Sequence, residues 1–366
     1  MITTPDVLLE KQKNIEMYRS SFAIRSGGVQ LPSITYIGEF STKVTSRNMS
    51  DLYISIPVKN QEAIIESVLT MLIDNTNLSF SIGLLFDNCT DNSLQLCADF
   101  FENKYSLHPN LISVHFIKSG GELFEATAEN ITFLFCVQKY FMSLQSDIYF
   151  TDKSFLARAI RVFEEKSNIF AISGKAIVSF KIMSKLQKFL STIFHSYNIL
   201  LQIFPKTRSK RKLGCYFPFL GYFGDLSRPP KSFMGYSRKQ LSNFYIGEAV
   251  IRGPILWRSA IFRKLNGFDD IGFPLGRDDC DLCFRAHIEG YLSGYMPCES
   301  YSIYNQGTTR KPRSIADQKA LTEREVLARK FPGDLARYWN GSKELHKKIG
   351  RAQQLRKREK SLRTFQ

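Results

Sequence analysis

The sequence lacks any uncharged stretch long enough to cross a membrane. The longest, Phe189–Pro205, is shorter than the ~20 apolar residues of a spanning helix and contains several polar side chains. Met1 to Asn14 lack the apolar segment of a secretory signal. Seven scattered cysteines in 366 residues form no disulfide framework. We therefore predict a protein without spanning segments, in the reducing cytoplasm.

Acidic residues are scarce relative to basic ones, since 34 Asp and Glu face 50 Lys and Arg, for a net charge of +16. An anionic partner is therefore expected: a nucleotide, a nucleic acid or a lipid surface. Part of the excess lies in the tail, where nine Lys or Arg face two Glu between Lys343 and Gln366. Because no recognisable nucleic-acid-binding module accompanies this tail, the pattern favours a solvated basic helix.

Short apolar runs alternate with helical periodicity from Asp51 onward, which predicts βαβ units and a mostly parallel sheet. Strands are predicted at Leu52–Pro57, Ser81–Phe86, Leu111–Ile117, Asp147–Phe150 and Ile169–Ser173. Helices are predicted at Glu62–Asp74, Ser93–Lys104, Glu129–Leu144 and Leu156–Glu165. In such sheets, ligands bind where loops leave the carboxyl ends of the strands.

The same pattern sets the domain boundaries. Residues 1–50 are polar and weakly periodic, an N-terminal extension with at most one helix. Residues 51–310 form the predicted catalytic domain, interrupted by an insertion or subdomain at 181–247, and residues 311–366 form a basic helical C-terminal extension.

Polar loop segments follow the predicted strands and carry the candidate chemistry. They are Pro57-Val-Lys-Asn-Gln-Glu62, Asp87-Asn-Cys-Thr-Asp-Asn-Ser93, Phe150-Thr-Asp152, Gly267-Phe-Asp269 and Asp278-Asp-Cys-Asp-Leu-Cys-Phe-Arg285. In this order the chain resembles the family 2 inverting glycosyltransferases with the GT-A fold, over roughly Leu52 to Gly307. The resemblance implies a Rossmann-like α/β core that binds nucleotide-diphospho-sugars.

The resemblance also implies residue roles. Donor binding falls on Pro57, Lys59, Glu62, Asp87 and Asn88. Asp279 corresponds to the catalytic base, because a carboxylate near the acceptor hydroxyl can take its proton. Asp278 stands beside it, where the family usually has Glu, and is expected to support the helix start. Local spacing also predicts an Asp281–Arg285 ion pair one helical turn apart.

A divalent metal, Mn²⁺ or Mg²⁺, is the cofactor that the family's D-x-D motif implies, since a hard cation held by carboxylates can balance a leaving diphosphate. Placed at Phe150–Asp152, this motif retains only Asp152 as the metal ligand. A second departure is that the family's Gly-Lys is replaced by Gly121-Glu122.

The predicted function is transfer of a sugar from a nucleotide-sugar donor to an acceptor hydroxyl, with inversion. The acceptor is a glycan, a lipid-linked molecule or a protein, and the sequence leaves this choice open. Two alternatives remain: a catalytically weak, glycosyltransferase-like binding or scaffold protein, and a basic nucleic-acid-binding protein. Phe189–Phe204 and the basic residues after it fit a core helix with a solvated loop, or peripheral contact with an anionic membrane.

Overall fold

The structure, a computed structural model, describes residues 4–41, 51–105, 108–174, 176–178, 245–247, 250, 252–274, 278–296 and 298–302. Most of the predicted 181–247 insertion and the whole predicted 311–366 extension lie outside the described residues. The described residues contain no helix long and apolar enough to cross a membrane.

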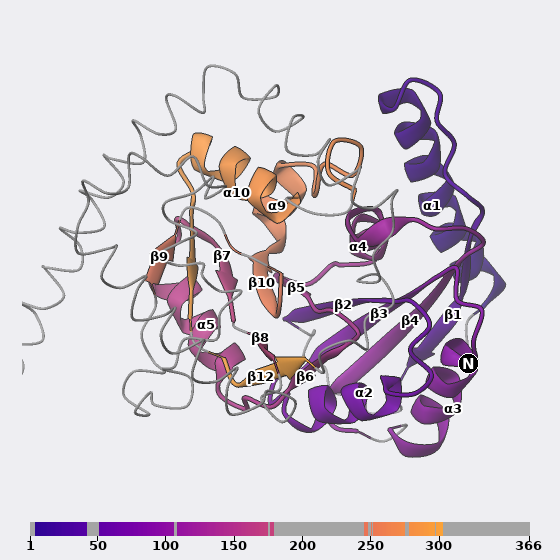
Figure 1. Cartoon of the computed structure of the whole chain (residues 1–366), viewed down its shortest axis with the longest axis horizontal. Helices are drawn as coiled ribbons and strands as arrows, with labels where there is room; N and C mark the ends of the chain where they lie inside the picture. The colour runs from indigo at the N-terminus through magenta and orange to yellow at the C-terminus, as the bar shows by residue number, and fades with distance from the viewer. Residues whose placement is uncertain are drawn as a thin grey trace, which may run out of the picture. The chain divides into compact units, whose positions relative to one another are not determined.

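The helices of the described residues are α1 (Pro5–Arg25), α2 (Ile65–Asp74), α3 (Ser93–Lys104), α4 (Phe124–Phe133), α5 (Phe155–Glu165), α9 (Ser259–Lys264) and α10 (Asp278–Ile288). The strands are β1 (Ile34–Ser41), β2 (Leu52–Val58), β3 (Phe80–Asp87), β4 (Leu111–Ser119), β5 (Tyr140–Ser143), β6 (Ile148–Phe150), β7 (Ile169–Ser173), β8 (Ala176–Val178), β9 (Tyr245–Gly247), β10 (Ile255–Arg258), β11 (Leu292–Tyr295) and β12 (Ser300–Ser302). Figure 1 shows their arrangement.

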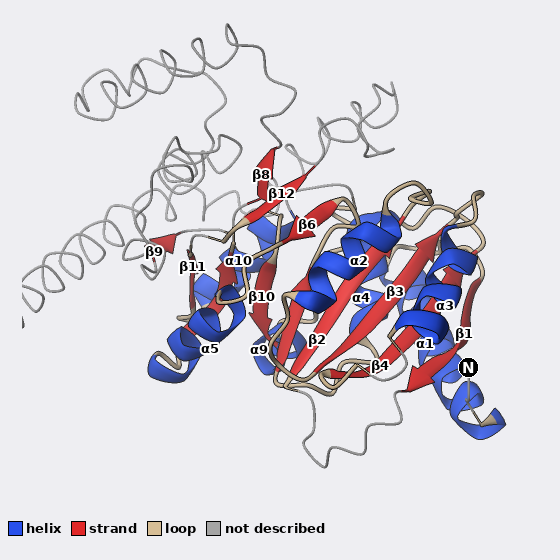
Figure 2. Cartoon of the chain, turned by 90° about the horizontal axis from the view of Figure 1, so that it is seen from below, coloured by secondary structure: helices blue, strands red, loops and turns tan. Residues whose placement is uncertain are grey.

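Nine of the described strands form one sheet in the order β1-β4-β3-β2-β5-β10-β7-β11-β9. The strands β4, β3, β2, β5, β7 and β11 run in one direction, and β1, β10 and β9 run in the other. The predicted α/β fold with a mostly parallel sheet is therefore confirmed. Helices α2 and α3 cover one face of the sheet, and α4 covers the opposite face (Figures 1 and 2).

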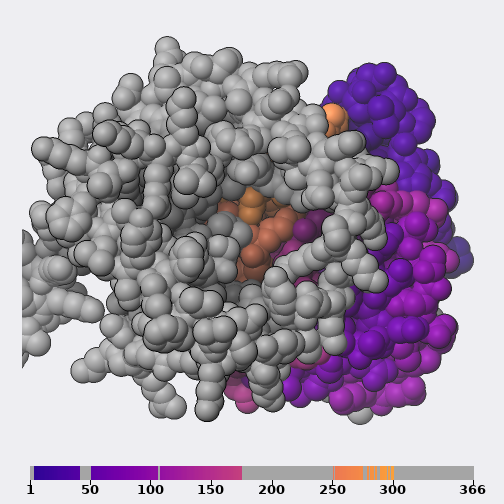
Figure 3. Space-filling view, in the orientation of Figure 1, coloured from indigo at the N-terminus to yellow at the C-terminus, as the bar shows by residue number. Residues whose placement is uncertain are grey.

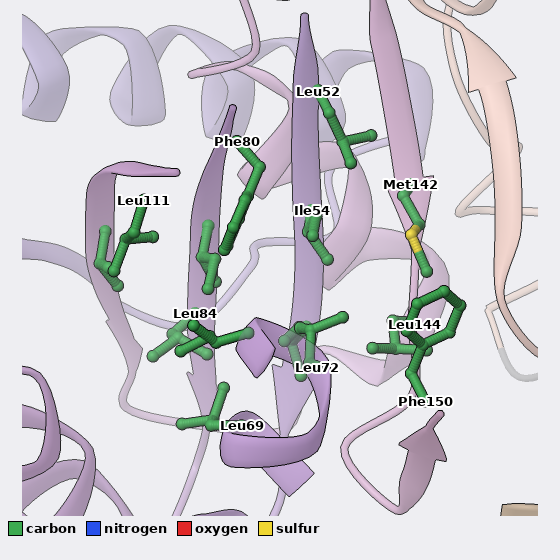
Figure 4. Close-up of a cluster of buried hydrophobic side chains, with 14 of the residues drawn as sticks. Leu52, Ile54, Leu69, Leu72, Phe80, Leu84, Leu111, Met142, Leu144 and Phe150 are labelled. Atoms are coloured by element: carbon green, nitrogen blue, oxygen red, sulfur yellow. The ribbon is translucent and has the colours of Figure 1, made fainter. Parts of the chain in front are cut away.

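The core lies between α2, α3 and the central strands. Leu69 and Leu72 of α2 face Leu52, Ile54 and Leu84 of the sheet, and all five are fully buried (Figure 4). Burying such side chains stabilises the fold by about 1.5–3 kcal/mol each, which explains the apolar runs of the central strands. The core thus fixes the parallel strands whose carboxyl ends carry the polar loops.

The N-terminal segment adds a strand to the sheet, which the sequence did not predict. Strand β1 pairs antiparallel with β4, from Ile34 opposite Ser119 to Ser41 opposite Ser113. The Gln12 amide of α1 holds β1: it donates to the Ile34 carbonyl and accepts from the Tyr36 N–H, both at 2.9 Å. Helix α1 thereby occupies backbone groups of an edge strand that would otherwise be open to another chain.

The predicted helix Glu129–Leu144 is wrong over most of its length, because this segment contains the end of α4 and the strand β5. Helix α4 ends at Phe133, and β5 pairs in parallel with β2, with Leu52 opposite Tyr140 and Ser55 opposite Ser143. This segment is rich in apolar residues, so periodicity alone cannot distinguish a buried helix from a short buried strand. The fourth parallel strand is therefore β5, and the predicted strand at Asp147–Phe150 is β6, in a separate three-stranded sheet with β12 and β8.

Candidate functional site

The candidate site lies at the carboxyl ends of β2, β3 and β5. These neighbouring strands are parallel, so the residues that follow them reach the same edge of the sheet. Pro57 is half-buried within β2, Lys59 follows the strand, and Asp87 is the last residue of β3. The structure thus brings the predicted donor-binding residues of the first two loops together.

Hydrogen bonds join the loops after β2 and β3. The Asn60 Oδ1 accepts from the Thr90 N–H at 2.8 Å, and a Glu62 carboxylate oxygen accepts from the Asn92 N–H at 3.0 Å. In return, the Asp91 carboxylate accepts from the Glu62 N–H at 3.0 Å. Through these bonds Glu62 links the loop after β2 to the loop after β3, just before α3 begins. This contact is structural.

Two asparagines allow these loops to turn sharply. Asn60 and Asn88 adopt positive φ values of 50° and 48°, a backbone region that Asn tolerates better than most residues. Asn88 is half-buried directly after Asp87. Its conformation turns the chain at the end of β3, so its backbone shapes the loop beside Asp87.

Asp87 is buried and points toward the start of α4. Its Oδ1 accepts from the Leu123 N–H at 2.7 Å. Burial raises the pKa of Asp87, while the hydrogen bond from Leu123 and the positive charge of Lys59 act in the opposite direction. The Lys59 Nζ also lies 4.0 Å from the Glu122 Oε1. One cation thus lies between two carboxylates at this edge of the sheet.

A second group of charges surrounds the half-buried guanidinium of Arg252. It lies 3.1 Å from the Glu125 Oε1 and 2.6 Å from the Glu129 Oε1, both on α4. It also donates to the Asp278 carboxylate at the start of α10. The Arg252 backbone N–H donates to the Asp279 Oδ2 at 3.0 Å. Asp278 and Asp279, predicted as catalytic residues, therefore share one partner.

Glu129, Asp278 and Asp279 are buried, at 5% exposure for Asp279 and about 1% for Asp278, whereas Glu125 is half-buried. Burial disfavours their charged forms, so the pKa values of Glu125 and Asp278 are raised and that of Glu129 is raised to about 8. The nearby Arg252 opposes each shift. One guanidinium does not balance this many neighbouring carboxylates, so the pKa of Glu129 stays raised.

The raised pKa of Glu129 gives a testable pH dependence. The unfolded-state pKa is about 4.3, so between about pH 5 and pH 8 the folded protein binds more protons than the unfolded chain, and its stability falls as pH rises. Glu129→Gln removes this titration. We expect its free energy of unfolding, relative to wild type, to increase with pH by up to ~1.4 kcal/mol per pH unit.

Urea unfolding of both proteins at several pH values measures this trend. The matched control is Glu289→Gln, at a half-exposed carboxylate that pairs with Lys264 at 2.9 Å. The control difference should stay flat. A flat difference for Glu129→Gln as well would show that Glu129 is ionised throughout this range.

The GFD segment after α9 is held by α4 and α1. The Asn130 amide of α4 donates to the Phe268 carbonyl and accepts from the Phe268 N–H, both at 2.9 Å. Asp270 accepts from Tyr18, and from Arg25 at 3.1 Å, both on α1. The predicted ion pair between Asp281 and Arg285 is confirmed at 2.8 Å. These contacts fix the loop that precedes α10.

Asp152 does not lie with the other predicted site residues. Its Oδ1 accepts from the Ser154 N–H and hydroxyl at 2.9 and 2.7 Å, and its Oδ2 accepts from Arg158 at 2.7 Å. The adjoining Lys153 carbonyl accepts from Asn77, just before the amino end of β3. Asp152 therefore lies near the amino ends of the strands, whereas Asp87 lies at a carboxyl end. Its carboxylate oxygens accept hydrogen bonds at the start of α5.

After β5 and Leu144 the chain continues with Gln145, Ser146 and Asp147, about sixty positions after Asp87. Because β5 is the parallel neighbour of β2, this segment reaches the candidate site and Asp152 does not. The Gln145 amide donates to the Glu125 Oε1 at 3.0 Å. Among the described residues, no three His, Cys, Asp or Glu side chains form a group that could hold a metal ion. Asp152 is therefore not placed at this sheet edge as a metal ligand, and the divalent metal stays a prediction.

Sequence reasoning missed Arg252, Glu125, Glu129 and Asn130. Their partners lie far along the chain, so no local spacing marks them. One available signal was charge, because Glu125 and Glu129 occupy successive turns of an otherwise uncharged segment. In the space-filling view, the orange surface of described residues after about position 250 lies beside the magenta surface of earlier residues (Figure 3).

No protein-family model matches the chain, and no curated protein matches it. Among solved structures, it is similar to Staphylococcus aureus TarS 1–349 in complex with UDP-GlcNAc, at 12% identity over 77% of this chain and 73% of that one, with a TM-score of 0.44. It is also similar to the mannosyltransferase PcManGT from Pyrobaculum calidifontis in complex with GDP-Man and Mn²⁺, at 10% identity over 92% and 89%, with a TM-score of 0.45. These similarities establish no family.

Proposed function

We propose that this protein is a glycosyltransferase that transfers a sugar from a nucleotide-diphosphate donor to an acceptor hydroxyl with inversion. The observation that carries the proposal is that the beginning of α4 connects three parts of the site. Asp87 binds the Leu123 N–H, Gln145 binds Glu125, and Glu125 lies against Arg252, whose N–H binds Asp279. Residues almost two hundred positions apart are thereby joined at one sheet edge.

The donor side of the proposed site is formed by the loops after β2 and β3. Asp87 would accept hydrogen bonds from the nucleoside, because a buried carboxylate makes strong charge-assisted bonds to N–H and O–H donors. Lys59, 19% exposed and next to two carboxylates, would contact the anionic diphosphate. Lys59 and Asp87 lie directly at the ends of β2 and β3, so a donor could reach both without rearrangement of the core.

The proposed reaction is a single displacement. The acceptor oxygen bonds to the anomeric carbon, its proton passes to Asp279, and the bond from that carbon to the diphosphate oxygen breaks. The nucleoside diphosphate leaves with the electron pair. One displacement inverts the anomeric configuration. Asp279 suits the base role because its Oδ2 is fixed by a backbone N–H at the start of a helix.

The test is a panel of UDP-, GDP- and dTDP-sugars, with and without Mn²⁺. A donor that binds the folded protein raises the melting temperature by mass action, and its turnover releases nucleoside diphosphate. We expect at least one donor to give both signals. Neither signal with any donor would refute the proposal.

A second candidate function, binding without turnover, is favoured by one observation. The segment after β5 has Gln145 and a single acid, Asp147, where a D-x-D motif has two acids. A donor that raises the melting temperature while releasing no nucleoside diphosphate would identify the chain as a glycosyltransferase-like binding protein. The acceptor class, a cytoplasmic location and contact with an anionic membrane stay predictions.

A further inference from the structure

Arg252 connects two helices that are separate in the sequence. It lies just before β10, and its guanidinium contacts Glu125 and Glu129 of α4 as well as Asp278 of α10. The Phe268 ring lies against the same guanidinium, 5.2 Å from centroid to carbon. The side chain is held on several sides and has one defined orientation.

The backbone of the same residue determines where Asp279 points. The Arg252 N–H donates to the Asp279 Oδ2 at 3.0 Å, while its guanidinium holds the adjacent Asp278. The Arg252 side chain and the carboxylate of the proposed base are therefore mechanically linked. A shift of the guanidinium moves the turn that carries this N–H.

Only an arginine can form this arrangement. A planar guanidinium presents several N–H donors in a fixed fork and stacks on an aromatic ring, whereas the lysine ammonium is a compact point charge. The two helices need such a fork, because the acids lie on both sides of the residue. A lysine at position 252 would reach one side alone.

We propose that Arg252 is a positioning residue for Asp279, which it orients by bridging the acids of α4 to the start of α10. The inference rests on the proposed function, because it assigns Asp279 the role of base. It extends that function to residues outside the recognised motifs. Arg252 itself contacts neither donor nor acceptor in this proposal.

Removing Arg252 has two consequences that must be separated. It leaves buried carboxylates without their cation, which destabilises the fold. It also releases the turn that orients Asp279, and a misplacement of about 1 Å at a catalytic group costs about 10²-fold in rate. Removing a negative charge can restore the lost stability, but it cannot restore the orientation of Asp279.

The experiment compares Arg252→Gln, Asp278→Asn and the double variant with wild type. The measurements are urea unfolding, the melting-temperature shifts given by UDP, GDP and dTDP, and nucleoside diphosphate release from the panel of sugars. We expect Arg252→Gln to lose stability and about 10²-fold in kcat, with KM for the donor nearly unchanged. Asp278→Asn alone should lose less activity.

The double variant decides the question, because it replaces a charged pair by a neutral one. We expect it to regain stability while kcat remains about 10²-fold below wild type. If its kcat instead returns to that of Asp278→Asn alone, Arg252 acts only as a counter-charge and the proposal is wrong. Should Arg252→Gln fail to fold, this comparison still stands.

Arg258→Gln is the matched control, since Arg258 is a second partly buried arginine, the last residue of β10, and donates to the Ile169 and Lys166 carbonyls at 2.6 and 2.9 Å. It should lower stability and leave kcat near wild type below its melting temperature. A wild-type protein that releases no nucleoside diphosphate would refute the proposed function, whereas an active Arg252→Gln would refute this inference alone.

Discussion

Asp279→Asn is expected to reduce sugar transfer by about 10²–10⁴-fold, the usual contribution of general-base catalysis. Asn preserves the size of the side chain and one acceptor oxygen for the Arg252 N–H, so the start of α10 should keep its structure. It cannot take the proton of the acceptor hydroxyl. Donor binding, measured as the shift in melting temperature, should stay near wild type.

Two neighbouring carboxylates supply controls for this prediction. Asp281→Asn should mainly lower stability, because Asp281 is fully buried and pairs with Arg285. Asp278→Asn should reduce turnover less than Asp279→Asn does. Wild-type turnover by Asp279→Asn together with loss of turnover by Asp278→Asn would move the base by one residue. Full activity in both variants of a demonstrated transferase would exclude the proposed mechanism.

Asp87→Asn is expected to weaken donor binding by about 10–100-fold, because a hydrogen bond to a charged group contributes about 1.5–3 kcal/mol. The amide oxygen can still accept from the Leu123 N–H, so the loop before α4 should remain in place. The effect should appear in the dissociation constant of the donor. With saturating donor, kcat should change little.

The pH dependence of donor binding gives an independent check. Burial raises the pKa of Asp87, so its charge is lost at a higher pH than for an exposed Asp. Wild-type affinity should therefore fall as pH is lowered through this raised pKa, and the affinity of Asp87→Asn should stay flat. Asp91→Asn, at a partly exposed loop residue that binds the Ser93 N–H, is the control. Equal affinity of wild type and Asp87→Asn would remove Asp87 from the donor site.

Sequence patterns predicted the first part of the sheet well. The strands at Leu52, Phe80 and Leu111 and the helix Ser93–Lys104 occur where the apolar runs and the helical period placed them. These elements bury long apolar stretches, so their own residues carry the signal. The loops after β2 and β3 followed from the same reasoning, since their polar residues begin where the strands end.

Other elements could not be predicted from local sequence. Strand β5 is four residues long, and the largely apolar residues before it show no change of period that marks its start. Because β5 pairs with β2, the segment Gln145–Asp147 reaches the candidate site in the place where the sequence predicted Asp152. Strand β1 joins the sheet only because β4 offers it an edge.

The sequence by itself determined the alternation of strands and helices, the net basic charge and the two acidic segments that begin at Asp87 and Asp278. Those features depend on residues close to one another in the chain. Only the tertiary structure decided that Arg252 joins the acids of α4 to the start of α10, and that Asp152 lies apart from them. Burial and pairing between distant segments set these contacts, and they change the pKa of a group such as Glu129 in a way that no spacing of residues records.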